Sequence, residues 1–537
     1  MQNHIELEAK ILDIDTGAVV ERLQKNGARK ILDAITIIET YDVYGTHIPK
    51  KRGRSELHQR YSRIITEVEK FTQSKNSLLS QGAYLRLRQE GKRSELILKY
   101  GTGKKDVRIK SEREISISVR SKKEWKSVQA MLVERGLRKV FYQEKHRISY
   151  VYDKANLRFD IDTWPGVPTY IEIEGASNEA VKKGARMIGY RASDLRSFKA
   201  KEVFKKYSIS PIFLTFKKNS VQITHNKLLT VMHSALSKRG IVKKDADWIV
   251  NHYYEAELMG KKTHGVRKFC WDMQFYDQRI SKPKVIKDSY AVAIIDGNRE
   301  IGPLAARFCI HLVTKKANQF GIAVIGLRNF QRYGVLATWT KTIAEKGLVG
   351  IVTNSTEPFV VPPNGKKIPV LGTNPLSIGF PTATNPIVMD ISTTKEPMSL
   401  VWYERTRGGV LPKNTFFDSK GMYTTDPWLA RWVDVWGGLK GFNFSCMLQL
   451  FSGPLLGAQT EHAWENPYEV GAVFIAINPD FLQSRSTVEK STTDFIRFLK
   501  KNNVILPGDH GRAVYTLNKK KKRIILSEQV WGWLNLL

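Results

Sequence analysis

The sequence is poor in cysteine and has no long apolar run. Its three cysteines, Cys270, Cys309 and Cys446, lie far apart and form no CxxC pair. This argues against a zinc cluster or a disulfide framework and suits a reducing compartment. No apolar run can span a bilayer, and the N-terminus MQNHIELEAK lacks a basic-then-apolar signal pattern. We therefore expect a cytoplasmic protein without a membrane segment.

Acidic residues are also scarce. The chain has 86 Lys and Arg against 52 Asp and Glu, which gives a net charge of +34. Such a field attracts nucleic acid, anionic membranes or phosphorylated metabolites, although a cell with a generally basic proteome gives the same balance. A nucleic-acid-associated protein is the least favoured hypothesis, because the sequence has no aromatic-and-basic RNA motif such as an RNP signature.

Two common nucleotide-binding motifs are missing as well. No GxGxxG follows a predicted strand, and there is no GxxxxGK[ST]. Any nucleotide site must therefore be of another type than the Rossmann fingerprint or the P-loop. At 537 residues the chain exceeds what one hydrophobic core usually supports, so we expect at least two domains.

Charged and apolar residues alternate repeatedly in the first 207 residues, which predicts half-buried strands. For any single strand, a solvated charged face explains the pattern. The polar faces together carry both clustered carboxylates, which suit a hard divalent cation, and clustered Arg and Lys, which suit phosphate oxygens. This combination is what a metal–polyphosphate complex requires.

The motifs Glu6-x-Glu8-x-Lys10, YLRLR and FDIDTWPGVPTYIEIEG resemble those of the CYTH superfamily, the triphosphate tunnel metalloenzymes, over residues 1–207. The resemblance implies a closed antiparallel barrel of about eight strands whose polar face lines a tunnel. It leaves triphosphate hydrolysis, thiamine triphosphate hydrolysis and class IV adenylate cyclisation open. It makes Glu6, Glu8, Glu172 and Glu174 candidate ligands of Mg²⁺ or Mn²⁺, and Lys10, Arg86, Arg88, Lys99, Lys145 and Arg147 candidate triphosphate-binding residues.

Residues 44–80 are longer and more basic than the connection expected in that family, which indicates an inserted arm. Its KKRGR run at residues 50–54 is more typical of a solvated loop than of a nucleic-acid contact. Residues 208–222 read as a linker to a second domain at 223–537.

The second domain alternates predicted helices at 243–259, 302–319 and 335–346 with predicted strands at 321–327 and 348–355. This order favours an α/β domain, a mixed or parallel sheet covered by helices. Residues 371–390 read as a Gly-Thr-Asn-Pro turn followed by two strand-like segments, and Asp390 ends the second. Taken alone, the turn is as consistent with an ordinary surface turn as with a binding loop.

The motifs THGVRKF, IDGNREIGPLAAR, TNSTEPF, LGTNP, IVMDIS, GGLKG with SGPLLGA, and LPGDHGR resemble the malate/L-lactate dehydrogenase family over residues 223–537. Its members reduce 2-oxo acids or related imines with NADH or NADPH through a non-Rossmann fold. The resemblance makes His264 the acid/base and Lys440 a binder of phosphate or substrate carboxylate. It makes the following residues candidates for binding NAD or NADP: Asn354, Ser355, Asp390, Ile391, Ser392, Lys440, Gly508, Asp509 and His510. We also expect a homodimer through this domain.

Four positions depart from that family's pattern. Thr263 replaces the usual Ser and keeps its hydroxyl, while Lys268, unless Arg267 substitutes, replaces an expected Arg. Arg332 stands where a second His is expected, and Lys-Glu-Pro at 395–397 replaces small residues. Arginine cannot act as a general base near neutral pH. Either the remaining histidine works alone, or the substrate carries more negative charge, or this half is a degenerate scaffold beside a triphosphatase or cyclase.

Overall fold

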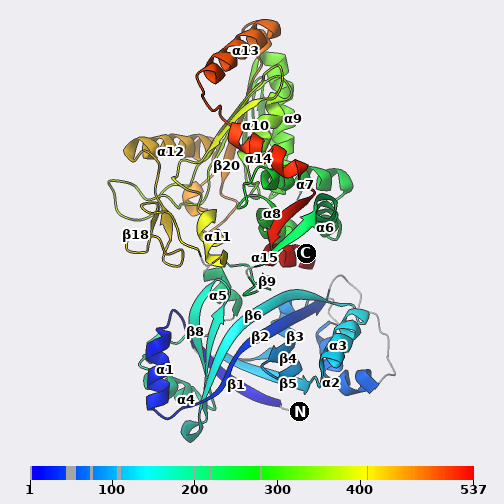
Figure 1. The fold of residues 1–537 in the computed structure, drawn as a ribbon, viewed down its shortest axis with the longest axis vertical. Coiled ribbons are helices and arrows are strands. Elements are labelled where there is room, and N and C mark those ends of the chain that lie inside the picture. Colours follow the sequence, from blue (N-terminus) through cyan, green and yellow to red (C-terminus); the bar gives the residue numbers. More distant parts are fainter. Residues whose placement is uncertain are drawn as a thin grey trace. The chain divides into compact units, whose positions relative to one another are not determined.

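The structure, a computed structural model, describes residues 3–43, 56–72, 77–105, 110–198, 200–206, 209–217, 219–278, 281–407, 409–463 and 465–537. The chain divides into two compact units (Figure 1). Unit 1 comprises Met1–Asn219 and Ser527–Leu537, and unit 2 comprises Ser220–Leu526. In the described part of the chain, no helix has both the length and the apolar character needed to cross a bilayer.

Unit 1 is built on a curled antiparallel sheet with the strand order β2-β3-β4-β5-β1-β8-β7-β6. Strand β2 also pairs antiparallel with β6, so the first and last strands of this order are hydrogen-bonded (Figure 1). The short strand β9 (Phe213–Leu214) adds to β6 in parallel. The eight longer strands are β1 (Asn3–Ile11), β2 (Arg29–Val43), β3 (Ala83–Glu90), β4 (Arg93–Lys105), β5 (Lys110–Ser118), β6 (Leu137–Tyr152), β7 (Leu157–Trp164) and β8 (Val167–Gly175).

Helices cover the outer, apolar face of this sheet. The helices α1 (Thr16–Lys25) and α4 (Asn178–Met187) pack over a cluster that includes Ile11, Phe159 and Ile173. The helices α2 (Glu56–Thr72) and α3 (Lys122–Glu134) pack over a second cluster that includes Leu85 and Leu98. Because successive strand residues point to opposite faces, the charged residues between these positions face the inside of the curl.

Helix α2 lies within the predicted inserted arm, and the basic run at residues 50–54 lies outside the described residues. A buried apolar cluster with Trp164 and Tyr170 receives Val203 and Phe204 from α5 (Ala200–Lys206). Helix α15 (Glu528–Leu536) packs on β9 in the same unit.

Unit 2 contains a seven-stranded sheet in the order β11-β12-β13-β20-β14-β15-β16. The sheet is mixed, which is one of the two arrangements that the sequence predicts. Among its described strands, only β12 and β13 pair in parallel. Its strands are β11 (Lys284–Ser289), β12 (Val292–Asp296), β13 (Ile322–Arg328), β14 (Val349–Asn354), β15 (Leu376–Phe380), β16 (Ile387–Ile391) and β20 (Gly471–Ile477).

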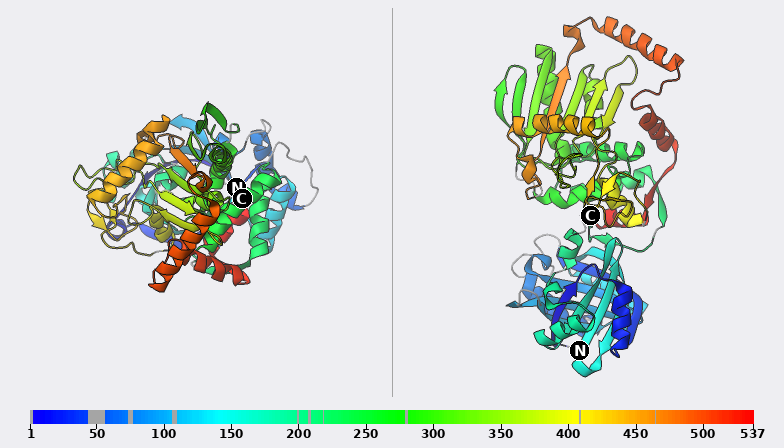
Figure 2. Two further views of the ribbon diagram at one scale, coloured as in Figure 1. Left: turned by 90° about the horizontal axis from the view of Figure 1, so that it is seen from above. Right: turned by 90° about the vertical axis from the view of Figure 1, so that its left-hand side faces the viewer.

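Helices α9 (Gly302–Phe320) and α10 (Leu336–Ala344) cover one face of this sheet, and α12 (Leu439–Ser452) lies on the other (Figures 1 and 2). Helix α10 can lie close to the sheet because Gly379 has no side chain. A Cβ there would lie 2.4 Å from the carbonyl oxygen of Thr340. Strands β15 and β16 form an antiparallel hairpin that carries Asp390, which confirms the two strands predicted after the Gly-Thr-Asn-Pro turn.

Candidate functional sites

The inner face of unit 1 brings oppositely charged predicted residues together. The β1–β8 register sets Glu8 opposite Glu174 and Lys10 opposite Glu172. The Nζ of Lys10 lies 3.2 Å from Oε1 of Glu8 and 2.9 Å from Oε1 of Glu172. The Nζ of Lys99 lies 3.6 Å from Oε2 of Glu8. Two neighbouring strands therefore concentrate both signs of charge in a buried space.

Three of the four predicted metal ligands form a compact carboxylate cluster. Oxygens of Glu8, Glu172 and Glu174 lie within 4.8 Å of one another, while the side chain of Glu6 lies outside the described residues. Burial opposes the charge of Glu172, yet nearby cations, Lys10 foremost, hold its pKa well below the usual range. Three carboxylate oxygens at this spacing fit a hard divalent cation such as Mg²⁺ or Mn²⁺.

Arg147 is the centre of a second group of ion pairs. Its Nη2 lies 2.7 Å from Oδ2 of Asp162 and 2.8 Å from Oε2 of Glu172, and its Nη1 pairs with Asp160. Asp162 also accepts a 2.7 Å hydrogen bond from Lys145, whose pKa is lowered by burial and then by Arg147. Asp160 and Asp162 are fully buried. Neither was predicted as a site residue, although the alternating sequence FDID places both on the same face of a strand.

Arg158 was also missed by sequence reasoning. Its Nε lies 2.9 Å from Oδ1 of Asp160 and 4.0 Å from Oε2 of Glu174. The predicted residue Arg88 has Nη2 3.3 Å from Oε2 of Glu95. These contacts extend the paired charges along the same inner face.

Arg86 differs from the other predicted triphosphate-binding residues. Its Nε is buried without a hydrogen-bond partner, and its guanidinium lies over the ring of Tyr84, with Cζ 4.9 Å from the ring centroid. A buried donor without an acceptor is unfavourable. Arg86 therefore offers a donor to an anionic ligand.

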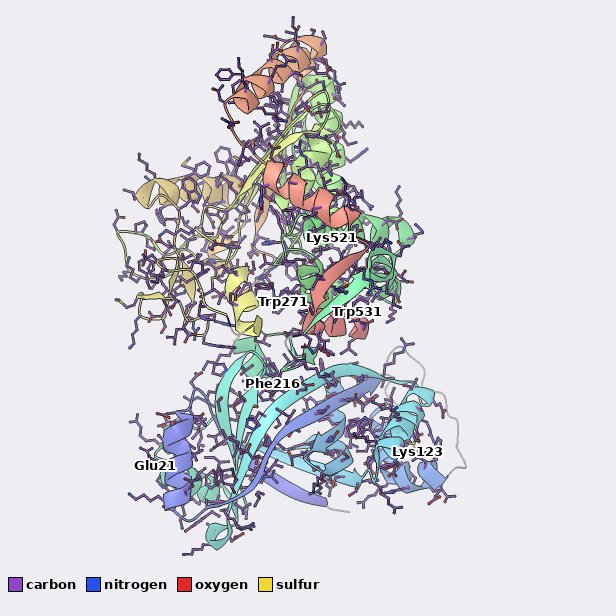
Figure 3. All side chains as sticks on the ribbon, in the orientation of Figure 1. Glu21, Lys123, Phe216, Trp271, Lys521 and Trp531 are labelled. Atoms are coloured by element: carbon purple, nitrogen blue, oxygen red, sulfur yellow. The ribbon has the colours of Figure 1, made fainter. Side chains whose placement is uncertain are left out.

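In unit 2, His264 lies between α7 (Lys243–Leu258) and α8 (Val266–Asp272), the helix that Trp271 marks in Figure 3. Glu257 of α7 fixes this loop because it accepts hydrogen bonds from the backbone N–H of Val266 at 3.0 Å and from Nζ of Lys262 at 2.5 Å. A Cβ on Gly265 would lie 2.9 Å from the Cα of Glu257, so only glycine allows this close packing.

The surroundings of His264 favour a neutral imidazole. Its Nδ1 lies 2.9 Å from Oγ1 of Thr263. Nζ of Lys261 donates a 2.6 Å hydrogen bond to Oδ2 of Asp390, which brings strand β16 to the histidine loop. Burial lowers the pKa of His264 to about 4, and the charges of Lys268 and Lys261 contribute. At neutral pH this imidazole can accept a proton.

Two of the departures from the family pattern are cations paired with carboxylates. Lys268 pairs with Asp272, and Arg332 pairs with Glu357. Burial lowers the pKa of both cations, and it lowers the pKa of Arg267 to about 10. Beside them is a small cavity of about 20 Å³ lined by Asp272, Phe275, Gln331, Arg332, Pro467 and Tyr468.

The predicted cofactor residues divide into buried and accessible groups. Asn354 and Ser355 are buried at the end of β14, and the backbone N–H of Ser355 donates to the carbonyl of Gly471. Ile391 and Ser392 line an open groove of about 550 Å³ together with Thr394, residues 395–397 and Trp436. The groove begins directly after Asp390, so it offers space for a large ligand beside the histidine loop.

Lys440 is exposed in the first turn of α12. It follows Gly437 and Gly438, whose φ angles of 64° and 59° are favourable only for glycine. Gly438 occupies the N-cap position and has no side chain that could cap the helix. An uncapped helix N-terminus beside an ammonium group is suited to phosphate.

Gly508, Asp509 and His510 lie at the start of α14 (Asp509–Lys520). A Cβ on Gly508 would lie 2.7 Å from the carbonyl oxygen of Val388, so the start of α14 contacts β16 closely. These three residues are thus beside the strand that carries Asp390.

The described residues define an α/β unit with a candidate acid/base histidine, joined to a curled antiparallel unit with a candidate metal–phosphate site. Residues 223–535 match the model of the malate/L-lactate dehydrogenase family, and the chain belongs to this family. Residues 69–206 match the CYTH domain, so the chain also contains a CYTH domain. Both resemblances noted in the sequence are confirmed. The CYTH match begins after β1, so it does not include Glu8 and Lys10.

Relatives of known name cover the second unit. L-sulfolactate dehydrogenase of Methanothermobacter thermautotrophicus is 26% identical over 319 residues, which is 56% of this chain and 91% of that protein. Malate dehydrogenase of Pyrococcus horikoshii is 28% identical over 272 residues, 47% of this chain and 74% of that protein. The structure of malate dehydrogenase from Entamoeba histolytica covers 59% of this chain and 96% of its own, with a TM-score of 0.54 and 21% identity. At this identity the match shows the fold.

Proposed function

We propose that unit 2 interconverts a 2-hydroxy acid and a 2-oxo acid with NAD or NADP. The observation that carries the proposal is the neutral, partly buried His264 on a loop that the Lys261–Asp390 pair joins to β16. In oxidation, His264 removes the hydroxyl proton of the substrate, and in reduction it returns that proton to the substrate oxygen. The nicotinamide, when bound, supplies or accepts the hydride. The groove at Ile391 and Ser392 and the exposed Lys440 suit this cofactor.

The cations near His264 favour a substrate with two acidic groups. Arg267, Lys268 and Arg332 are all desolvated enough to lower their pKa values. Lys268 and Arg332 already pair with carboxylates of the chain. The burial of Arg267 is not offset by a carboxylate of the described residues, and an acidic group of the substrate would offset it. The named relatives act on malate and sulfolactate, both of which carry a second acidic group beside the 2-hydroxy acid. We propose the same substrate class for this chain.

A panel of 2-oxo acids, assayed with both nicotinamide cofactors, tests this proposal. Loss of NADH or NADPH absorbance is measured with oxaloacetate and sulfopyruvate, which carry two acidic groups, and with pyruvate, which carries one. We expect turnover of the first two, its loss in His264→Gln, and normal turnover in His311→Gln, since His311 is exposed on α9. No turnover by the natural chain, or undiminished turnover by His264→Gln, would refute the assignment.

We propose that the CYTH domain forms a triphosphate tunnel that binds and hydrolyses a triphosphate with Mg²⁺ or Mn²⁺. Glu8, Glu172 and Glu174 would hold the cation, which withdraws charge from phosphate oxygens. Lys10 and Arg86, with the other inner-face cations, would hold the triphosphate. The unpartnered Nε of Arg86 is the observation that points to an anion.

The test of this second activity is phosphate release from inorganic triphosphate by the full chain with each metal. Glu172→Gln is expected to abolish release, and Glu179→Gln, at an exposed ion pair with Lys182 on α4, is expected to leave it unchanged. Release that survives Glu172→Gln would rule out the proposed metal site. A cyclase would instead release pyrophosphate from ATP, so the same assay with ATP separates these activities.

We infer a homodimer through unit 2, with α12 at the interface. This helix carries several exposed apolar side chains, since Leu439, Met447, Leu450 and Phe451 are each about half exposed. A cluster of exposed large apolar residues often marks an interface, and a second copy presents the same surface. Sedimentation of Phe451→Glu should give a monomer, while Ile505→Glu, at an exposed apolar residue in a loop, should leave the dimer intact. A natural chain that sediments as a monomer would refute this inference.

We retain domain boundaries of 1–207 and 223–537, joined through 208–222, as a proposal. The two family matches lie within these ranges. In the structure, β9 and β10 (Ser220–Thr224) fall in the joining segment, and Ser527–Leu537 packs with unit 1. A cytoplasmic location is part of the same proposal.

A further inference from the structure

The open groove of unit 2 is lined by two extended segments that pair with each other. One segment, residues 391–397, lines most of the groove, and the other ends at Trp436. The backbone N–H of Lys395 donates a 3.0 Å hydrogen bond to the carbonyl of Asp434, and an antiparallel bridge follows it. The Nε1 of Trp436 donates a 2.8 Å hydrogen bond to the carbonyl of Ser392. The pairing of the two segments therefore places the Trp436 ring at the groove.

The second segment continues from a small antiparallel sheet of three strands in the order β18-β17-β19. Its strands are β17 (Phe416–Phe417), β18 (Tyr423–Thr424) and β19 (Trp432–Val433). Strands this short provide few backbone hydrogen bonds, so side-chain contacts must supply much of what holds the sheet in place. Because Asp434 follows β19 directly, the position of this sheet sets the position of one wall of the groove.

Lys395 connects the groove to this sheet through its side chain as well as its backbone. Its Nζ donates a 2.6 Å hydrogen bond to Oδ2 of Asp434 and a 2.8 Å hydrogen bond to the carbonyl of Asn414, shortly before β17. The hydroxyl of Tyr423 on β18 donates a 2.6 Å hydrogen bond to the same oxygen of Asp434. One ammonium group and one carboxylate thus connect the groove with residues in or next to each strand of the sheet.

Position 395 is one of the departures from the family pattern, which has small residues there. A small side chain cannot reach the carboxylate of Asp434, so this connection requires the lysine. The side chain of Lys395 is 35% exposed and that of Asp434 is 13% exposed, so the pair is partly shielded from water. Burial, and then Asp434, raise the pKa of Tyr423 to about 12, so its hydroxyl keeps the proton that it donates at neutral pH.

We propose that Lys395 is a positioning residue for the cofactor, because it holds the three-stranded sheet, and with it Trp436, at the groove through Asp434. The inference rests on the proposed binding of NAD or NADP in this groove. A ligand binds more tightly when the wall that it contacts is already held in place. Loss of Lys395 should therefore weaken cofactor binding and leave the proton transfer at His264 unchanged.

The experiment measures kcat and the KM for NADH and NADPH in the full chain. Lys395→Ala introduces a small residue and is expected to raise the KM of the cofactor in use about fivefold, with kcat changed by less than about twofold. Lys395→Arg keeps a cation with several donors and should restore most of the affinity. Asp434→Asn should add little to Lys395→Ala, because both changes break one connection. Lys413→Ala, at an exposed lysine of the same loop as Asn414, is the matched control and should change neither parameter.

Hydrogen exchange tests the same role without turnover. The backbone amides of residues 414–436 should exchange several-fold faster in Lys395→Ala than in the natural chain, because the sheet opens more easily. Lys413→Ala should leave their exchange unchanged. If Lys395→Ala does not fold, Tyr423→Phe, which removes one hydrogen bond to Asp434, should show smaller effects in the same direction.

Different results would overturn different statements. An unchanged KM in Lys395→Ala would refute the positioning role, and so would a raised KM with unchanged exchange, since Lys395 would then act by direct contact. A lowered kcat at unchanged KM would place Lys395 in the chemical step and refute the proposal as well. No turnover by the natural chain with either cofactor would instead refute the proposed function of unit 2, and hydrogen exchange would still test the connection between Lys395 and the sheet.

Discussion

Replacing Lys261 by Met is expected to raise the pKa of His264. Lys261 lowers this pKa, whereas Asp390, whose Oδ2 lies 2.6 Å from the Lys261 Nζ, raises it. The substitution removes the cation and leaves the carboxylate of Asp390 without its ion-pair partner. Both changes favour the imidazolium form, so they add.

The size of the effect follows from the exposure of Lys261, because 35% of its side chain is accessible to screening water. With an effective dielectric constant of roughly 40, a unit charge some ~7 Å away contributes about 1.2 kcal/mol, equal to about 0.9 pKa unit. Burial, the largest cause of the low pKa, is unchanged by the substitution. The pKa of His264 should therefore rise from about 4 toward 5 and remain below its ordinary value of 6.5.

Two measurements check this expectation. If His264 is the base of the proposed 2-hydroxy acid oxidation, the acidic limb of kcat/KM reports its neutral form and should move to higher pH by about one unit in Lys261→Met. An NMR titration of the His264 imidazole, assigned by its loss in His264→Gln, reports the same pKa without turnover. Lys243→Met is the matched control, because Lys243 is an exposed lysine at the start of α7 that pairs with Asp247. An unchanged pKa, or a lower one, in Lys261→Met would refute the reasoning.

Three further predictions concern stability and cofactor binding. Gly379→Ala should lower the free energy of unfolding by about 1–3 kcal/mol in urea, because its Cβ would lie 2.4 Å from a backbone oxygen. Gly511→Ala is the control: no atom lies within 4 Å of the new Cβ, so the free energy of unfolding should differ from that of the natural chain by no more than about 0.5 kcal/mol. Arg147→Met should lower the free energy of unfolding by roughly 3–5 kcal/mol, because three carboxylates lose a shared partner. Hydrogen exchange in β6–β8 measures this loss, and a loss below about 1 kcal/mol would contradict the prediction. Trp436→Ala should raise the KM for NAD or NADP several-fold at unchanged thermal stability, since this half-exposed ring lines the groove, and an unchanged KM would place the cofactor elsewhere.

Much of unit 1 could be predicted because its strands alternate without interruption. The period of two sends Glu8 and Lys10 to the same face, and strand pairing then brings them to Glu172. The partners of these residues across the curl could not be predicted. Lys99 of β4 approaches Glu8 of β1 only because the sheet curls, since β5 lies between these two strands. Such a contact between distant strands leaves no local signal in the sequence.

In unit 2 the local elements were predictable and the sheet was not. The predicted helix at 243–259 appears within one residue of its expected ends, and the two strand-like segments after the Gly-Thr-Asn-Pro turn are β15 and β16. Strand β20, far along the chain, inserts between β13 and β14 and makes most neighbours antiparallel. The same insertion explains why Ser355 is buried, since its backbone N–H bonds to Gly471 at the start of β20.

Arg332 is the residue that best distinguishes two explanations of the departures from the family pattern, an altered substrate and a lost activity. Arg332 pairs with Glu357 of the TNSTEPF motif, so its charge is compensated within the chain. Lys268, which stands for an expected arginine, likewise pairs with Asp272. Both substitutions are charge-compensated and leave His264 neutral and able to accept a proton. Under the proposed function, an acidic group of the substrate would have to displace Asp272 or Glu357 to pair with these cations, whereas a degenerate scaffold would keep both pairs for stability alone.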